Sequence, residues 1–211
     1  MSKVFEQGEI NGMVVANRFV RSATWEGQAS DDGSVTPKLT DTMTALARGG
    51  VGFIISGHAY VSPEGQAGPW QLGIDRDERI PGLQSMTAAV HDNGGKIVAQ
   101  LAHAGHFAAE QLTGLPPVVA SDYEGLAESP RRELTTGDIQ GLVTAFANAA
   151  KRARESGFDG VQIHSAHGYL LSQFLSPVFN RRQDNYGGSI ENRARIHLEV
   201  YRAIRDAVGS D

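Results

Sequence analysis

The stretch RARESGFDGVQIHS, residues 152–165, contains the pattern that decides the fold. It consists of the end of an amphipathic helix, a glycine, and then a short apolar run. Glycine directly after a helix is the usual left-handed cap, and a short apolar run of this kind is typical of a buried parallel strand. The same pattern occurs in ALARGGVGFIIS (45–56) and AAVHDNGGKIVAQL (88–101). The sequence therefore predicts a repeated helix–strand unit.

Extending this pattern along the chain predicts strands near 17–24, 51–56, 96–101 and 159–164. We also expect a helix over 36–48 after the first strand and a last helix over 189–208. Helices that alternate with strands indicate either a doubly wound sheet or a (β/α)8 barrel. No G-x-G-x-x-G and no G-x-x-x-x-G-K-[ST] sequence follows any strand, so the usual dinucleotide and phosphate loops are missing.

Polar residues at the predicted strand ends favour the barrel. Side chains alternate along a barrel strand between the lumen and the helix layer. Val98 and Gln100 of the third strand, and Gln162 and His164 of the fourth, would then face the lumen. Barrel enzymes place their active sites at the carboxyl ends of the strands. A full barrel takes about 250 residues and eight strands. We therefore expect residues 1–211 to be a single domain with about the first four βα units, and strands 5–8 to be absent.

Two segments lie outside the repeats. Asn11-Gly12, between short β-like runs, is a strong hairpin signal, and we expect an N-terminal β-hairpin over one end of the sheet. Residues 106–134 are rich in Pro, Gly and Ala and lack periodicity. A loop of that length is more often functional than a linker.

Composition excludes several classes of protein. The 211 residues include 19 Lys and Arg against 24 Asp and Glu, a net charge of −5, and 40% are hydrophobic. That balance is typical of a packed domain, and the lack of a basic stripe excludes nucleic acid as a partner. There is no cysteine, hence no disulfide and no thiolate metal ligand. We find no signal peptide and no apolar run near the ~20 residues that span a bilayer, so we expect a cytoplasmic protein with no membrane partner.

The densest group of reactive side chains is in IHSAHGYLLSQFLSP, residues 163–177. His164, His167 and Tyr169 follow the fourth strand closely. Two imidazoles and a phenol can hold an oxyanion and supply a proton. The alternative is that the histidines cap the next helix and the tyrosine packs. The position at a strand end favours the functional interpretation.

A second histidine pair, His103 and His106, ends the third strand. Three-histidine zinc sites exist, but no Asp or Glu stands beside either pair, so we predict no metal. A hydrolase or a metalloenzyme that acts through these histidines remains an open hypothesis. Gln100 offers a donor and an acceptor that suit a flat heterocycle. It could equally fill the lumen and bond to a neighbouring strand.

The segment 179–204 combines a turn-rich loop with a helix start. Asn180, Arg181, Asp184 and Tyr186 precede two glycines. We expect them to lock a rigid loop that supports the site.

These motifs together resemble a known family. QLAHAG, GFDGVQIHSAHGYLLSQFLSP and N-x-R-x-D-x-YGGS-x-ENRAR are similar to the Old Yellow Enzyme group of FMN-dependent NADH:flavin oxidoreductases, and NRFVRSAT and VGFIISGHAYVSPEGQ look like its first two strands. The resemblance runs from about residue 4 to residue 211. It implies an FMN-binding TIM barrel that uses NADH or NADPH to reduce a small-molecule substrate, an activated alkene such as an α,β-unsaturated carbonyl compound.

The resemblance implies that several residues contact FMN. Ser22, Ala23 and Thr24 match the first strand where its backbone meets flavin N5 and O4. His58 matches the end of the second strand, against the ring, and Gln100 matches the glutamine at the pyrimidine edge.

It also implies a substrate site. His164 and His167 match the pair that holds the substrate's carbonyl oxygen, with His164 bordering the flavin. Tyr169 matches the tyrosine that protonates the substrate carbon opposite the hydride. Trp25, followed by Glu26, stands where relatives carry Thr or Cys near flavin O4, and we expect it to line the substrate pocket.

The family's fifth to eighth strands carry the arginine at the flavin N1/O2 edge and the phosphate cradle. A four-stranded piece would expose strand edges and an apolar face, which favours association, so we expect a homo-oligomer. The alternative function is an inactive half-barrel that binds no flavin and pairs with itself or a partner.

Overall fold

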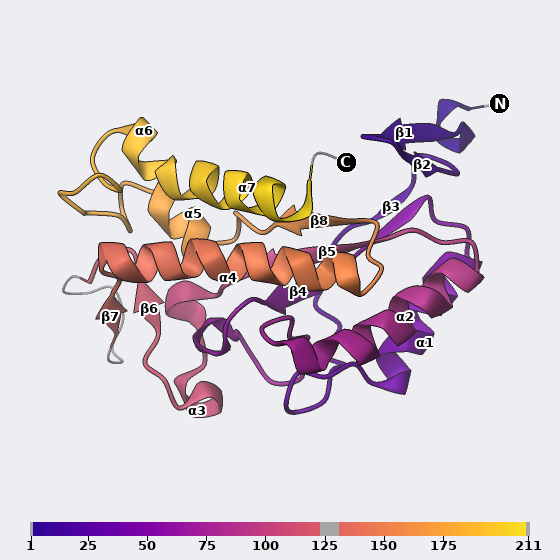
Figure 1. Ribbon diagram of the computed structural model, residues 1–211, viewed down its shortest axis with the longest axis horizontal. Helices are drawn as coiled ribbons and strands as arrows, with labels where there is room; N and C mark the ends of the chain where they lie inside the picture. The colour runs from indigo at the N-terminus through magenta and orange to yellow at the C-terminus, as the bar shows by residue number, and fades with distance from the viewer. Residues whose placement is uncertain (1, 123–130, 210–211) are drawn as a thin grey trace.

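The computed structural model describes residues 2–122 and 131–209, and it is an α/β fold built around a parallel sheet (Figure 1). The strands of this sheet lie in chain order: β3 (Val20–Arg21), β4 (Phe53–Tyr60), β5 (Ile97–Ala102) and β8 (Gly160–Ile163). A helix lies between each strand and the next along the chain. The predicted alternation of strands and helices is confirmed.

Four longer helices accompany the sheet: α1 (Pro37–Arg48), α2 (Ile80–Asp92), α4 (Thr136–Glu155) and α7 (Arg195–Val208). Figure 1 shows α4 and α7 side by side along β5 and β8. Their ends follow local chemistry. The Thr36 side chain accepts from the N–H of Leu39 ahead of Pro37, and Thr135 forms a capping box with Asp138.

The remaining elements are short. The strands are β1 (Gly8–Ile10), β2 (Met13–Val15), β6 (Val118–Val119) and β7 (Arg132–Glu133). The short α-helices are α3 (Glu110–Thr113), α5 (Leu170–Leu175) and α6 (Ile190–Arg193). The 3-10 helices are η1 (Lys3–Phe5), η2 (Pro63–Gly65), η3 (Asp77–Arg79) and η4 (Gly105–Phe107).

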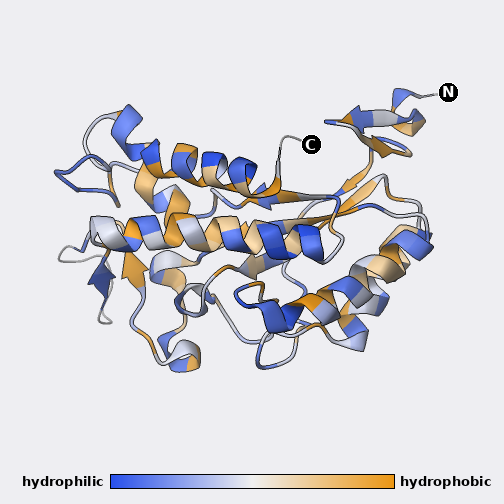
Figure 2. Ribbon diagram, viewed as in Figure 1, coloured by the Kyte–Doolittle hydropathy of each residue, from blue (hydrophilic) through white to orange (hydrophobic). Residues whose placement is uncertain are grey.

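The two faces of the sheet differ as the alternation predicts. Ile97, Ala99 and Leu101 are at most 1% exposed and pack in the core against the helices. Figure 2 shows the apolar residues along β4 and β5 and a mixed pattern on α4 and α7. On the other face, Gln100 is half-buried and Gln162 is exposed. The polar side chains therefore share one face of the sheet.

The first strand is shorter than the predicted 17–24. Of the predicted range, only Val20 and Arg21 form the strand β3 and pair with β4. The Asn17 side chain accepts from the N–H of Phe19 at 3.0 Å, which fixes a turn where the strand was expected to begin. At the end of β3, Arg21 forms an ion pair with Glu26 at 2.6 Å, which closes the intervening residues into a loop.

The other predicted boundaries are closer. The second strand begins at Phe53 and runs past the predicted end at 56 to Tyr60, and its register with β5 shifts between Ile55 and His58. The expected strands 96–101 and 159–164 and the expected helix 36–48 agree with β5, β8 and α1 to within one residue.

Two segments differ from the prediction. The expected helix 189–208 is present but is interrupted at Ala194, which divides it into α6 and α7, and there Ala194 O accepts from both His197 N (3.1 Å) and Leu198 N (3.2 Å). The expected loop 106–134 contains η4, α3 and β6, and β6 pairs in parallel with β7. Residues 123–130 of that loop lie outside the described residues.

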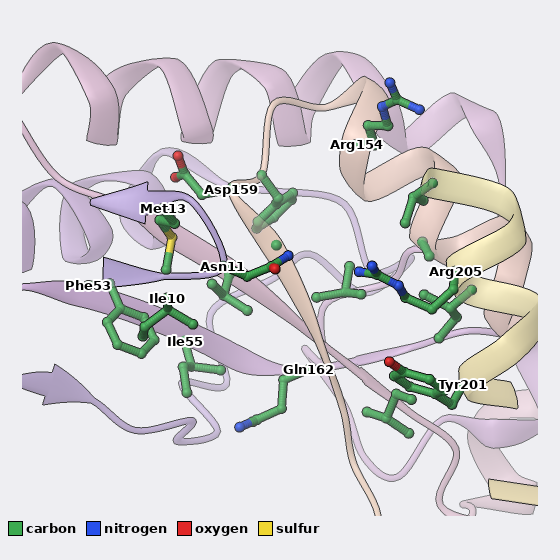
Figure 3. A pocket seen from close by; sticks show the side chains of 18 residues that line it. Ile10, Asn11, Met13, Phe53, Ile55, Arg154, Asp159, Gln162, Tyr201 and Arg205 are labelled. Carbon is green, nitrogen blue, oxygen red and sulfur yellow. The ribbon is translucent and has the colours of Figure 1, made fainter. Parts of the chain in front are cut away.

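The N-terminal hairpin is confirmed. β1 and β2 pair antiparallel, and Asn11 and Gly12 have φ of 47° and 84°, as a two-residue hairpin turn requires. Its residues Ile10, Asn11 and Met13 line a cavity of about 640 Å³ together with Phe53 at the start of β4 (Figure 3). The hairpin therefore lies at the amino end of the strands.

A buried polar network fixes the segment before α6. Buried Asn180 donates to the carbonyls of Phe174 (2.8 Å) and Tyr186 (2.7 Å). Asp184 accepts from the N–H of Tyr186 at 3.0 Å. Arg182, which the sequence did not single out, is 8% exposed. Its guanidinium donates to the carbonyls of Ala120 (2.9 Å) and Leu134 (2.6 Å) and to the carboxylate of Asp184 (2.6 Å).

Arg182→Met tests this network. The substitution keeps volume but leaves two buried carbonyls and a carboxylate without their donor, so we expect a loss of about 3 kcal/mol in the free energy of unfolding. Urea unfolding followed by circular dichroism measures it. Gln183→Met, at the exposed neighbouring position, is the matched control and should change stability by less than about 0.5 kcal/mol. Equal effects of the two substitutions would show that the network contributes nothing.

Candidate active site

The candidate site begins with one row of residues across the sheet. His58 of β4 pairs in register with Gln100 of β5, and Gln100 pairs with Gln162 of β8. Residues that share a row in a parallel sheet point to the same face. The register shift before His58 is what brings it level with Gln100. The row therefore places an imidazole and two amides on the polar face near the carboxyl ends of the strands.

Tyr169 lies beside His58, together with His164 and His167, the two histidines that follow β8. The Nε2 of His58 lies 3.0 Å from the hydroxyl of Tyr169, and the two rings stack at 5.4 Å. The ring of His164 lies 4.8 Å from that of Tyr169 and 5.3 Å from that of His167. The four side chains form one cluster of rings.

A tight turn brings Tyr169 back to the strand ends. His167 and Gly168 both have positive φ, 59° and 75°, and histidine is among the residues that tolerate this region. The N–H of Tyr169 donates to Ala166 O at 3.1 Å, and the N–H of Leu170 donates to His103 O at 3.0 Å. The second of these bonds ties the start of α5 to the end of β5.

Burial favours the neutral form of the His58 and His164 imidazoles. Burial, and then the neighbouring His58 and His167, lower the pKa of His164 to about 4. Burial also lowers the pKa of His58 and raises the pKa of Tyr169. Within the ranges that the structure describes, the ring nitrogens of His164 and His167 have no hydrogen-bond partner. At neutral pH, His164 therefore has one N–H to offer to a ligand.

The side-chain amides of Gln100 and Gln162 together present a hydrogen-bond donor and an acceptor. Gln100 donates its Nε2 to the Oε1 of Gln162 at 2.7 Å. This contact is the second of the two interpretations of Gln100, a bond to a neighbouring strand. Among the described residues, the Oε1 of Gln100 and the Nε2 of Gln162 have no partner. A paired donor and acceptor suit the edge of a flat heterocycle with adjacent C=O and N–H groups.

Ser22, Ala23 and Thr24 follow β3 as irregular backbone. An added Cβ at Gly57, the residue before His58, would lie 2.8 Å from Thr24 O and closer still to Glu26, so the loop lies directly on β4. Glu26, paired with Arg21, accepts from the N–H of Gly57 at 3.2 Å. The loop is thereby held beside His58, although among the described residues no hydrogen bond joins Ser22 or Ala23 to the ring cluster.

Trp25 lies apart from the ring cluster. Trp25 is 52% exposed, and a Cβ added at Gly68 would lie 3.5 Å from the Trp25 ring. The structure thus brings together His58, Gln100, His164, His167 and Tyr169 and leaves Trp25 on the surface beside residue 68.

One residue of the site was missed by the sequence analysis. Gln71 is 1% exposed, and its Nε2 lies 3.3 Å from the Nδ1 of His58. It lies in a loop without periodicity, so the sequence carried no signal for it.

The second histidine pair, His103 and His106, has other partners than the ring cluster. Buried His103 accepts from the N–H of Gly105 at its Nδ1 (3.1 Å), and His106 stacks on Phe179 at 5.4 Å. Within residues 2–122 and 131–209, no group of three His, Cys, Asp or Glu side chains is placed to hold a metal ion. Over the same residues, no helix combines the length and the apolar character needed to cross a bilayer.

Comparisons with known proteins agree with one another. Residues 3–211 match the model of the NADH:flavin oxidoreductase / NADH oxidase family. The chain is 43% identical over 212 residues to the NADH oxidase of Thermoanaerobacter brockii, covering 99% of this chain and 32% of that protein. It is 39% identical to an NADPH dehydrogenase of Geobacillus sp. strain WCH70, covering 96% of this chain and 59% of that protein.

Among solved structures, the Old Yellow Enzyme homologue from Zymomonas mobilis superposes with a TM-score of 0.91 at 32% identity. The match covers 99% of this chain and 61% of that one. The chain thus spans less than two thirds of the length of each of these proteins.

The lowered pKa of His164 gives a prediction about stability. The unfolded chain protonates this histidine near pH 6.5 and the folded chain only near pH 4. Proton uptake therefore accompanies unfolding between these values, and stability falls as the pH falls through this window. His164→Gln lacks the linked proton, so urea unfolding at pH 7, 6 and 5 should show wild type losing stability relative to the variant. Parallel stability curves would contradict the assignment of a neutral, buried His164.

Proposed function

The chain belongs to the NADH:flavin oxidoreductase / NADH oxidase family, and from this premise we propose that it forms the FMN- and substrate-facing part of an NAD(P)H oxidoreductase of the Old Yellow Enzyme type. In this proposal residues 1–211 are one domain, the first four βα units of a (β/α)8 barrel. The parallel sheet in chain order and the likeness to the Zymomonas mobilis protein support it. The protein's own substrate is a small molecule, an activated alkene such as an α,β-unsaturated carbonyl compound.

The residues present fit FMN. The free donor and acceptor at the Gln100–Gln162 pair suit the pyrimidine edge of the ring. Ser22, Ala23 and Thr24 would meet the ring through backbone groups, and His58 and His164 would border it. Bound FMN would supply hydride transfer, with NADH or NADPH as the reductant.

The chain's own residues then bind and protonate the substrate. His164 and His167, with ring nitrogens open to a ligand, hold the carbonyl oxygen and stabilise the negative charge that develops on it. Tyr169, whose ring centroid lies 4.8 Å from that of His164, delivers a proton to the substrate carbon. In this proposal Trp25, although exposed and apart from the ring cluster, lines the substrate pocket. The observation that carries this proposal is the position of the buried His164 imidazole directly beside the Tyr169 phenol.

We also propose that the protein acts in the cytoplasm and associates with itself. Phe53, Ile55 and Val98 of the sheet border the cavity of Figure 3, together with Tyr201 and Arg205 of α7. The sheet side of this cavity is largely apolar, and exposed apolar surfaces favour association.

Tyr169→Phe separates the two halves of the reaction in the protein that carries this chain. The substitution keeps the ring and removes the phenolic proton, and a positioned general acid contributes about 10²–10⁴-fold. We expect bleaching of the flavin absorbance by NAD(P)H at nearly the wild-type rate and recovery with an enone slowed by that factor. Stopped-flow absorbance resolves both steps. A variant that is slow only in the NAD(P)H step would show that Tyr169 is not the proton donor.

The double variant His164→Ala, His167→Ala serves as the comparison. These imidazoles act on the bound carbonyl in the ground and transition states alike, so KM for the enone should rise and kcat should fall. A wild-type KM would argue against their binding the carbonyl oxygen.

Gln100→Leu tests the flavin edge. The substitution removes the donor and acceptor beside the pyrimidine ring, which we expect to weaken FMN binding by about tenfold or to shift the flavin potential. Equilibrium dialysis and redox titration measure the two effects. Gln183→Leu, at an exposed position away from the sheet, is the control, and identical behaviour of both variants would remove Gln100 from the flavin site.

A further inference from the structure

The histidine that contacts Tyr169 is itself held by a buried glutamine. The Nε2 of Gln71 lies 3.1 Å from the carbonyl of His58 and 3.3 Å from its Nδ1. The backbone around Gln71 runs along the end of β4, where Tyr60 N donates to Leu72 O at 3.0 Å. Gln71 is therefore fixed at both its backbone and its side chain.

The orientation of the Gln71 amide follows from its two backbone partners. Its Oε1 accepts from the N–H of Ala67 at 2.7 Å, and its Nε2 faces the carbonyl of His58. An N–H can only donate and a carbonyl can only accept. The amide nitrogen, a donor, therefore faces the Nδ1 of His58, which must accept and carries no proton.

We propose that Gln71 is a positioning residue that fixes His58 as the Nε2–H tautomer, so that His58 donates its hydrogen bond to the Tyr169 oxygen. The Tyr169 hydroxyl proton is then not used in holding His58 and stays directed to the substrate. The bond from His58 stabilises the phenolate that remains after the proton leaves. The catalytic consequence rests on the proposed role of Tyr169. The tautomer of His58 does not depend on that role.

The charge environment is consistent with a neutral ring. Burial lowers the pKa of His58, against smaller opposite effects of a hydrogen bond to its own backbone and of the Glu26 charge. Glu26 is itself paired with Arg21 at 2.6 Å. The other titratable groups that face the His58–Tyr169 pair are His164 and His167. A neutral ring carries one N–H, so its position decides which partner donates.

The tautomer can be measured directly in the wild-type protein. Nitrogen-15 NMR of ring-labelled histidine, with His58→Gln to assign the signal, distinguishes a protonated Nε2 from a protonated Nδ1. We expect the proton on Nε2. A proton on Nδ1 in the wild-type protein overturns the proposal, whatever the activity.

Gln71→Glu then tests the cause. A carboxylate in this place only accepts, so Nδ1 should become protonated, and in the neutral ring Tyr169 must then donate to His58. We expect enone reoxidation to slow about tenfold while the NAD(P)H step is unchanged. An unchanged tautomer in Gln71→Glu would show that Gln71 does not set it.

His58→Gln and His58→Leu form a matched pair. A glutamine amide can replace the Nε2–H donor, and leucine cannot. The pKa of the Tyr169 phenol, read from tyrosinate absorbance against Tyr169→Phe, should rise by about one pH unit in His58→Leu and stay near wild type in His58→Gln. Equal values in the two variants would overturn the donation to Tyr169. If Tyr169→Phe leaves enone reoxidation unchanged, the proposed function fails while the tautomer result stands.

Discussion

The site depends on the register of three parallel strands. His58, Gln100 and Gln162 stand in one row because β4, β5 and β8 run in the same direction and the register of β4 shifts before His58. In a parallel sheet a slip of one residue would turn every side chain of the strand to the opposite face. The buried alternation of Ile97, Ala99 and Leu101 against the helices prevents that slip. Hydrophobic packing on one face thus positions polar chemistry on the other.

The loops at the strand ends are then fixed by polar groups. Glu26 with Arg21 holds the loop after β3 on Gly57, and the bond from Leu170 N to His103 O holds the turn that presents Tyr169. Arg182 performs a similar role below α6. Preorganised donors and acceptors of this kind keep a site in its working geometry without reorganisation during the reaction.

The sequence predicted the elements with strong periodicity. The strands β5 and β8, the helix α1 and the Asn11-Gly12 hairpin could be predicted because an apolar pattern or a specific turn residue marks each of them. The first strand was overestimated because the Asn17 turn and the Arg21–Glu26 pair replace ladder bonds with side-chain contacts. The break at Ala194 could not be predicted, because no proline or glycine marks it in the sequence.

The same distinction applies to the site. His164, His167 and Tyr169 could be found because they stand at a predicted strand end and match a family motif. Gln71 could not, because its position depends on a loop that lies beside β4 only in three dimensions.

The most direct measurement is the visible absorbance spectrum of the protein that carries this chain, purified at full length and titrated with FMN. The account predicts a yellow protein that holds FMN through gel filtration in a one-to-one ratio to the chain. A colourless protein that leaves added FMN in the free fraction would contradict it.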